Sequence, residues 1–231
     1  MTWIDLGNPV PHTHRAEDAK SPQSPYEPYT WPAGEIRALG TPTSAEEKPF
    51  FRVLDSRRSR RDFAPLSAGD LSALLWHSTR VLEHSKSSLG FELEIRPTPS
   101  GGAIHPIHIV IKNPNDPNGW RYDALSHALF EIPGSNALME GVIEHSDQML
   151  PPSGATLLIF VAEPRKTFAK YHDGCSLIWR DAGAMLGVLA LVAEGLGLNF
   201  CPLGITGEPW VRKLAPEGIL AGVGIALVGG R

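Results

Sequence analysis

Cysteine is scarce in this chain of 231 residues, which has only Cys175 and Cys201. Two cysteines cannot build the disulfide framework of a small secreted domain, and the absence of a CxxC pair excludes a zinc ribbon. We therefore expect a cytoplasmic protein and interpret both thiols as structural. The first residues, 1–9, lack the basic and apolar regions of a secretory signal. No apolar run reaches the roughly 20 residues of a membrane span, so we expect no membrane insertion.

Positive charge is not in excess either, since 21 Lys and Arg face 25 Asp and Glu, a formal net charge of −4. Proteins that bind nucleic acid draw most of their affinity from cations on phosphates, so we expect no nucleic-acid partner. The sequence has no GxGxxG, no GxxxxGK[ST] and no HExxH, which leaves no Rossmann, P-loop or zincin motif. We expect no metal site, and we interpret His105 and His108 as surface or capping histidines.

Hydrophobic residues make up 42 % of the chain and charged residues 20 %, enough for one buried core. Proline is concentrated at the start, where residues 1–50 hold eight of the 21 prolines. Such a segment cannot sustain a helix or a central strand. We predict that residues 1–49 form a proline-rich arm, or alternatively a free tail, and that residues 50–231 form the globular domain. The aromatic side chains that would pack the arm are Trp3, Tyr26, Tyr29 and Trp31.

The hydrophobic pattern of the domain predicts helices and strands without a regular βαβ alternation, which favours the α+β class. A capping box at Ser67–Asp70 opens a helix to about Val81. A long helix covers about 178–196 and ends at Gly195 and Gly197. The predicted strands are a hairpin of Ile107–Lys112 and Trp120–Asp123, a central strand Leu157–Ala162, and a last strand Gly222–Val228.

Three segments could take part in binding or catalysis, and their residues alone leave the role of each segment open. Ser56–Phe63 sets four arginines beside two hydroxyls, which suits a solvated face, a nucleic-acid patch or a phosphate site. Arg96–Pro106 contains two adjacent glycines, which permit close approach of a ligand or form an ordinary loop. Lys170 and Tyr171 place an amine beside a phenol. The two groups could transfer protons if they are desolvated; otherwise the segment is a surface loop.

The order of these segments resembles that of the nitroreductase superfamily of flavin enzymes. Arg57–Phe63 resembles the N-terminal flavin phosphate motif of that family, and the resemblance spans 50–231. Pro99–Pro106 is similar to the Pro-Ser-Ala-Gly segment of the branch with SagB-type and azoline dehydrogenases. Further similarities to that branch lie at Gly119–Tyr122, His127, Leu129, Lys170-Tyr171, Asp181–Gly183, Leu196–Leu198 and Pro202–Gly204.

The resemblance implies an α+β, nitroreductase-like fold, with a mixed central sheet flanked by helices, in an intertwined homodimer. It implies FMN as the cofactor, NAD(P)H as a further candidate electron donor, and hydride transfer between flavin N5 and a small molecule or peptide azoline. Lys170 and Tyr171 would be the catalytic bases. The residues implied in cofactor binding are Arg57, Arg58, Ser59, Arg61, Pro99, Ser100, Gly101, Gly102, Pro202, Leu203 and Gly204.

Two departures from the branch lie in the long helix, where Ala184 replaces its usual His and Gly187-Val188 replaces its Gln-Asn. They leave two alternatives open. One is an NAD(P)H-dependent nitroreductase or quinone reductase that needs no Lys-Tyr base. The other is a degenerate flavin fold that serves as a binding partner without catalysis.

Overall fold

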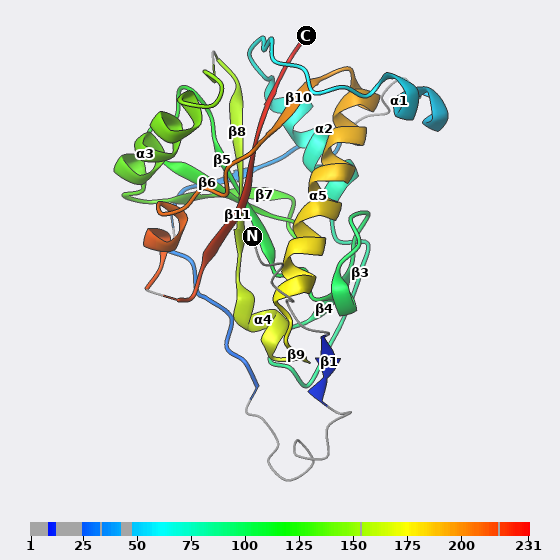
Figure 1. The fold of residues 1–231 in the computed structure, drawn as a ribbon, viewed down its shortest axis with the longest axis vertical. Helices are drawn as coiled ribbons and strands as arrows, with labels where there is room; N and C mark the ends of the chain where they lie inside the picture. The colour runs from blue at the N-terminus through cyan, green and yellow to red at the C-terminus, as the bar shows by residue number, and fades with distance from the viewer. Residues whose placement is uncertain (1–8, 13–24, 33, 43–47, 153, 217) are drawn as a thin grey trace, which may run out of the picture.

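The computed structural model describes residues 9–12, 25–32, 34–42, 48–152, 154–216 and 218–231. Its main feature is a seven-stranded sheet with the strand order β10-β11-β8-β5-β6-β7-β2 (Figure 1). The predicted α+β class with a central sheet flanked by helices is confirmed, and the described pairings are antiparallel rather than mixed. The strands are β2 (Ile36–Ala38), β5 (Ile107–Lys112), β6 (Gly119–Asp123), β7 (Ala128–Ile132), β8 (Thr156–Ala162), β10 (Asn199–Leu203) and β11 (Ala221–Gly229).

Five α-helices and two short 3-10 helices accompany the sheet in the described part of the chain. They are α1 (Phe50–Ser56), α2 (Ala68–Thr79), α3 (Asn136–Asp147), α4 (Pro164–Phe168), α5 (Cys175–Leu196), η3 (Gly101–Ala103) and η4 (Val211–Leu214). Two small ribbons complete the fold: β1 (Val10–Pro11) pairs with β9 (Tyr171–His172), and β3 (Glu83–Ser85) pairs with β4 (Leu93–Ile95).

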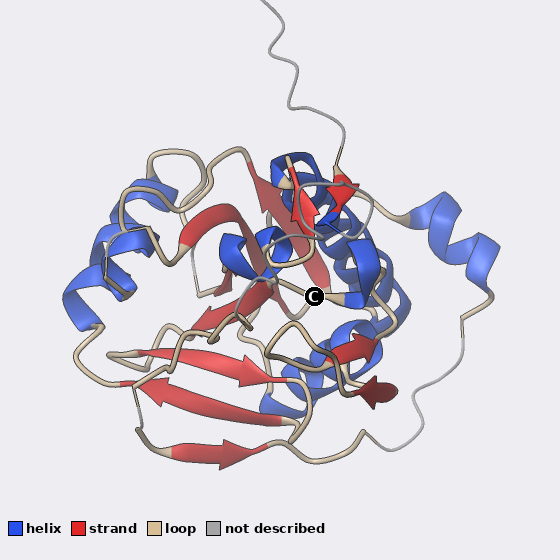
Figure 2. Cartoon of the chain, turned by 90° about the horizontal axis from the view of Figure 1, so that it is seen from below, coloured by secondary structure: helices blue, strands red, loops and turns tan. Residues whose placement is uncertain are grey.

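The sheet is covered on both faces, so its central strand is apolar from Leu157 to Ala162. All seven residues of β8 are buried, between β5 and β11, which confirms the predicted central strand. Helices α2 and α5 cover one face through Leu74 and Leu189, while α3 and η4 cover the other through Met139 and Val211. Figures 1 and 2 show α3 on one side of the sheet and α2 with α5 on the other.

The helix ends follow the predicted signals. The Ser67 hydroxyl caps α2 by accepting a hydrogen bond from the backbone N–H of Asp70 at 3.0 Å. Helix α5 ends at Gly197, whose φ of 77° lies in the left-handed region that glycine adopts without strain. Among the described helices, α5 alone is long and apolar enough to cross a membrane, but its inner side packs on the sheet as a core helix.

The part of the proline-rich segment that the structure describes at residues 25–32 lies on the domain. The Tyr26 hydroxyl donates to Glu163 Oε1 at 2.7 Å, and the Tyr29 hydroxyl donates to the carbonyl of Leu214 at 3.2 Å. The Trp31 ring lies 5.3 Å from the ring of His108. Trp3 lies outside the described residues, and the division of the chain after residue 49 stays a prediction.

Candidate functional site

The Pro99–Gly102 loop is held by one carboxylate of the long helix. Asp181 in α5 accepts a hydrogen bond from Ser100 Oγ at 2.5 Å and another from the Gly101 N–H at 3.0 Å. Ser100 Oγ in turn accepts from the N–H of His105 at 3.0 Å. Burial raises the pKa of the Asp181 carboxyl, although both hydrogen bonds oppose that shift. The shape of the loop is therefore fixed by α5, and the hydroxyl of Ser100 is engaged within the protein.

Lys170 and Tyr171 lie against this loop. Lys170 Nζ donates to the carbonyl of Gly102 at 3.1 Å. A Cβ on Gly102 would lie 2.6 Å from Tyr171 Oη and 2.8 Å from Lys170 Nζ, and the φ of Gly102 is +68°. The structure thus brings together two segments that are about 70 residues apart in sequence. The space beside Gly102, where two adjacent glycines could permit close approach of a ligand, is occupied by the ends of the Lys170 and Tyr171 side chains.

The arginine segment at Arg57–Arg61 follows α1 and passes the C-terminal end of α5. The backbone N–H of Arg60 donates to the carbonyl of Phe200 at 3.1 Å, and its guanidinium lies 3.4 Å from Glu194. Glu194 also pairs with Arg231 at 2.9 Å. Burial raises the pKa of Glu194, but its hydrogen bonds and the two cations outweigh that effect and lower it. Arg60, which the resemblance leaves without a role, therefore joins the segment to the helix.

The other members of this segment lie at the surface or half-buried. Arg58 donates to two neighbouring carbonyls, that of Asp55 at 2.9 Å and that of Arg57 at 2.7 Å. The side chains of Arg57, Ser59 and Arg61 form no hydrogen bond or ion pair with a residue that the structure describes. Two guanidinium forks and a hydroxyl that have no side-chain partner among the described residues match the oxygens of a phosphate group, so these residues fit the phosphate of FMN.

The arginine segment and the loop lie at opposite ends of α5 within one protomer (Figure 1). Their anchors, Asp181 and Glu194, are thirteen residues apart on the helix, which corresponds to about 20 Å. The third predicted segment follows the helix in β10: Pro202 and Gly204 are exposed, and Leu203 packs on the α3 side of the sheet. A single chain therefore does not bring the arginine segment and the loop into contact.

The interpretation of His105 and His108 as surface or capping histidines is wrong. His105 is buried, and its Nε2 lies 3.0 Å from the carbonyl of Glu94. Burial lowers the pKa of His105 to about 3, so this ring is neutral and donates to that carbonyl. His108 lies 3.0 Å from Glu163 through Nε2, and burial lowers its pKa as well. The His105 ring is thus buried, and the His108 ring is largely covered, with 18 % of its side chain exposed.

Sequence reasoning assigned no role to Asp181 or Glu163. Glu163 is 1 % exposed and accepts hydrogen bonds from the Tyr26 hydroxyl and the Tyr29 N–H, both at 2.7 Å. Burial raises its pKa, but the hydrogen bonds from His108 and these two groups together lower it. The sequence feature that could have identified Glu163 is a single carboxylate directly after the apolar run Leu157–Ala162. The feature that could have identified Asp181 is an acidic residue on the inner face of a long apolar helix.

The thiols differ in exposure. Cys201 is buried in β10, where burial raises the pKa of its thiol, and Cys175 is exposed at the first residue of α5. The described residues contain no group of three or more His, Cys, Asp or Glu side chains placed to hold a metal ion.

Solved structures with this fold include three that are informative. A protein from Ralstonia eutropha JMP134, assigned as a nitroreductase, is 20 % identical, with a TM-score of 0.61 over 90 % of this chain and 97 % of that one. The Escherichia coli microcin synthetase McbBCD complex, solved with truncated pro-MccB17 bound, is 20 % identical, with a TM-score of 0.60 over 100 % of this chain and 84 % of the matched chain. A protein from Desulfovibrio desulfuricans, also assigned as a nitroreductase and solved in complex with FMN, is 16 % identical. Its TM-score is 0.52 over 80 % of this chain and 87 % of that one.

No curated protein matches the chain. The family model described as the nitroreductase family matches residues 54–218, which is most of the chain and includes the arginine segment, the loop, the Lys-Tyr pair and β10. By that match the chain belongs to the nitroreductase family of oxidoreductases.

Proposed function

We propose that this protein is an FMN-dependent oxidoreductase of the SagB-type, azoline-dehydrogenase-like branch, which oxidises a five-membered azoline in a peptide or small molecule. The observation that carries the proposal is the contact of Lys170 and Tyr171 with the Gly102 backbone. A simple NAD(P)H-dependent reductase has no need of an amine and a phenol at this loop. The fold shared with a synthetase complex that was solved with a propeptide bound supports a peptide substrate.

The cofactor would be held by the residues that the resemblance implies. Arg57, Arg58, Ser59 and Arg61 would bind the phosphate, while Pro99–Gly102 and Pro202–Gly204 would line the flavin ring. When bound, FMN would supply a two-electron acceptor for hydride at N5. The side chains of Arg57, Ser59 and Arg61 form no hydrogen bond or ion pair within the described part of the chain, which supports the phosphate assignment.

The chain's own part in the reaction is to take the proton. Lys170 Nζ and Tyr171 Oη both lie within 2.8 Å of the position that a Cβ on Gly102 would take, so the amine and the phenol are neighbours and would act on the same side of a substrate at this loop. In the proposed oxidation one ring carbon would lose its proton to this pair and the neighbouring carbon would lose hydride, for which bound FMN would supply the acceptor, so that the ring would gain a double bond. The hydrogen bond from Lys170 to the Gly102 carbonyl holds the amine in place between turnovers.

A homodimer would complete the site. The outward side of α5 includes Trp179, which is 49 % exposed, and Gly183 and Gly187, where an added Cβ would meet no neighbour. Pairing two copies through this side would let the arginine segment of one protomer approach the loop of the other. We expect such a dimer in the cytoplasm, without nucleic acid or membrane as a partner.

The cofactor assignment is tested by the visible spectrum of the purified protein and by titration with FMN. Wild type should show the bands of oxidised flavin, and the double substitution Arg57→Ala with Arg61→Ala should weaken FMN binding at least about tenfold, because two charge-assisted contacts are lost. Arg212→Ala removes an exposed arginine from η4, away from the arginine segment, and serves as the matched control. A colourless wild type that binds no added FMN would instead support the degenerate binding partner.

The reaction is tested on a thiazoline-containing peptide. Wild type should oxidise it, whereas Lys170→Met and Tyr171→Phe should each lose that activity while they keep FMN. NADH and NADPH are then supplied with a quinone or a nitroarene. If wild type leaves the thiazoline intact and both variants retain full NAD(P)H turnover, the reductase alternative replaces the dehydrogenase.

A further inference from the structure

The proline-rich arm lies outside the resemblance, yet two of its described parts contact one short segment, residues 163–172. Residues 25–32 reach the start of this segment, through two hydrogen bonds to the carboxylate of Glu163. Residues 9–12 reach its end, where β1 pairs with β9 (Figure 1). Helix α4 and the Lys-Tyr pair lie between these two contacts. The arm therefore brackets the segment that carries both proton carriers.

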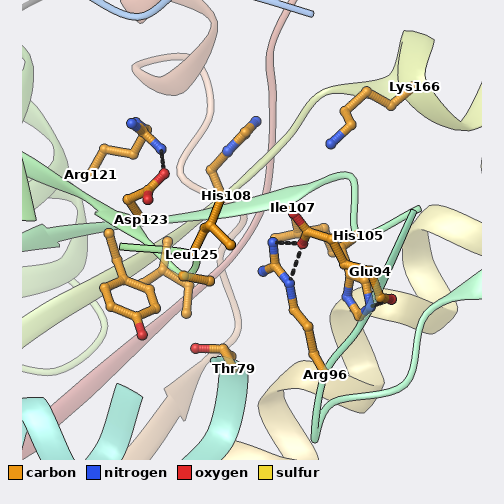
Figure 3. A pocket seen from close by; sticks show the side chains of 13 residues that line it. Thr79, Glu94, Arg96, His105, Ile107, His108, Arg121, Asp123, Leu125 and Lys166 are labelled. Carbon is orange, nitrogen blue, oxygen red and sulfur yellow. Dashed lines mark hydrogen bonds and ion pairs between the residues drawn. The ribbon is translucent and has the colours of Figure 1, made fainter. Parts of the chain in front are cut away.

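The segment has little support of its own. Helix α4 has five residues, of which Thr167 alone is buried, and so short a helix is not stable by itself. On the side of Lys166 it faces a cavity of about 200 Å³ (Figure 3). Beyond the helix, β9 pairs only with β1 among the strands that the structure describes. The conformation of Lys170 and Tyr171 thus depends on contacts from outside the segment.

His12, the residue after β1, contacts the chain on both sides of the Lys-Tyr pair. Its backbone N–H donates to the carbonyl of Lys170 at 3.1 Å. Its Nε2 donates to the carbonyl of Phe168 at 2.8 Å, and its Nδ1 lies 2.7 Å from Nε2 of His172. One residue of the arm therefore holds the chain at three alternate positions, before, within and after the pair.

The register of the β1–β9 ribbon places Pro11 opposite Tyr171. Because His12 and Lys170 share a ladder hydrogen bond, the alternation of an antiparallel ribbon makes Pro11 and Tyr171 a non-hydrogen-bonded pair. The N–H that proline lacks is not needed at such a position. The Cα atoms of such a pair are about 4.5 Å apart, the closer of the two antiparallel spacings. Pro11 is therefore the direct cross-strand neighbour of Tyr171.

We propose that Pro11 and His12 are positioning residues for Lys170 and Tyr171, so that the arm is a working part of the site. The arm holds the backbone of the pair, while the loop contacts the ends of its side chains at Gly102. Together these contacts fix the amine and the phenol at the loop, as proton transfer to a positioned base requires. The role of the pair rests on the proposed function, whereas its placement by the arm does not.

Two substitutions at His12 remove these contacts stepwise in the full chain. His12→Ala removes the two ring contacts, and His12→Pro also removes the N–H that donates to Lys170. The kcat for a thiazoline-containing peptide should fall at least about fivefold in His12→Ala and further in His12→Pro. KM should change less than about twofold, because the base acts in the transition state, and FMN affinity should not change. His77→Ala, at an exposed histidine of α2, should behave as wild type does.

Hydrogen–deuterium exchange followed by mass spectrometry measures the placement of the segment without any activity. The amides of residues 168–172 should exchange at least about tenfold faster in His12→Pro than in wild type, while those of β8 should not change. Unchanged exchange at 168–172, faster exchange throughout the chain, or a normal kcat in His12→Pro would each overturn the positioning role. If wild type leaves the thiazoline intact, the proposed reaction fails, and the exchange rates still decide whether the arm holds the segment.

Discussion

His105 shows how a single residue can couple the loop to pH. Its backbone N–H holds Ser100, and its buried ring is held at the carbonyl of Glu94. Burial lowers its folded-state pKa to about 3, whereas the unfolded chain titrates near about 6.5. Between these two pH values the unfolded state binds one more proton. The free energy of unfolding therefore falls as the pH falls from about 6.5 toward 3.

We predict that His105→Asn removes this dependence. Asparagine tolerates the positive φ of 47° at this position and carries no proton in this range. Urea unfolding at pH 7 and pH 5 should show that wild type loses about 2 kcal/mol more than the variant over this interval. Equal losses in the two proteins would mean that the His105 ring becomes protonated without unfolding.

At the scale of elements, the contact between the loop and the Lys-Tyr pair rests on Gly102. Gly134 has a similar φ of +71°, and an added Cβ there meets nothing, so it supplies a matched control. Gly102→Ala and Gly134→Ala should each cost about 1 kcal/mol of stability, because both place a Cβ in the left-handed region. Only Gly102→Ala should displace the tips of Lys170 and Tyr171.

Fluorine NMR of protein labelled with 3-fluorotyrosine measures this displacement, since the chain has four tyrosines. The Tyr171 resonance, identified by its loss in Tyr171→Phe, should shift in Gly102→Ala and stay in place in Gly134→Ala. An unmoved resonance in both variants would refute the packing of Tyr171 against the loop.

Elements with strong local signals could be predicted from the sequence, and those fixed by tertiary packing could not. The capping box at Ser67 and the apolar run of β8 can each be recognised from a few consecutive residues. In contrast, β10 contains Pro202 and Cys201 and owes its strand conformation to pairing with β11. Helix α4 has five residues and begins at Pro164, too short for any periodic pattern.

The same distinction applies to the site. The resemblance supplied the arginine segment, the loop and the Lys-Tyr pair, each as a local motif. The anchoring of the loop by Asp181 and the burial of His105 join residues from different elements, so no local pattern could reveal them.

At the scale of the whole molecule, large apolar side chains remain uncovered along one side. Helix α1 leaves Phe50, Phe51 and Leu54 exposed, and it stands away from the rest of the chain in both views (Figures 1 and 2). Its one buried residue, Val53, lies near Gly195 of α5. A seven-residue helix with three exposed apolar side chains needs a partner surface to bury them, and the outward side of α5 in a second copy offers one.

We therefore predict that Phe51, which is 76 % exposed in the protomer, is buried between two copies. Sedimentation equilibrium should give wild type twice the chain mass of 25.1 kDa, and Phe51→Glu should raise the dimer dissociation constant at least about a hundredfold, since each copy loses about 2 kcal/mol of apolar burial. Met149→Glu, at another exposed apolar residue, should leave the dimer intact. Because the arginine segment and the loop lie at opposite ends of α5, FMN affinity should fall together with dimerisation in Phe51→Glu. A wild type that is monomeric and still binds FMN would show that one protomer completes the site.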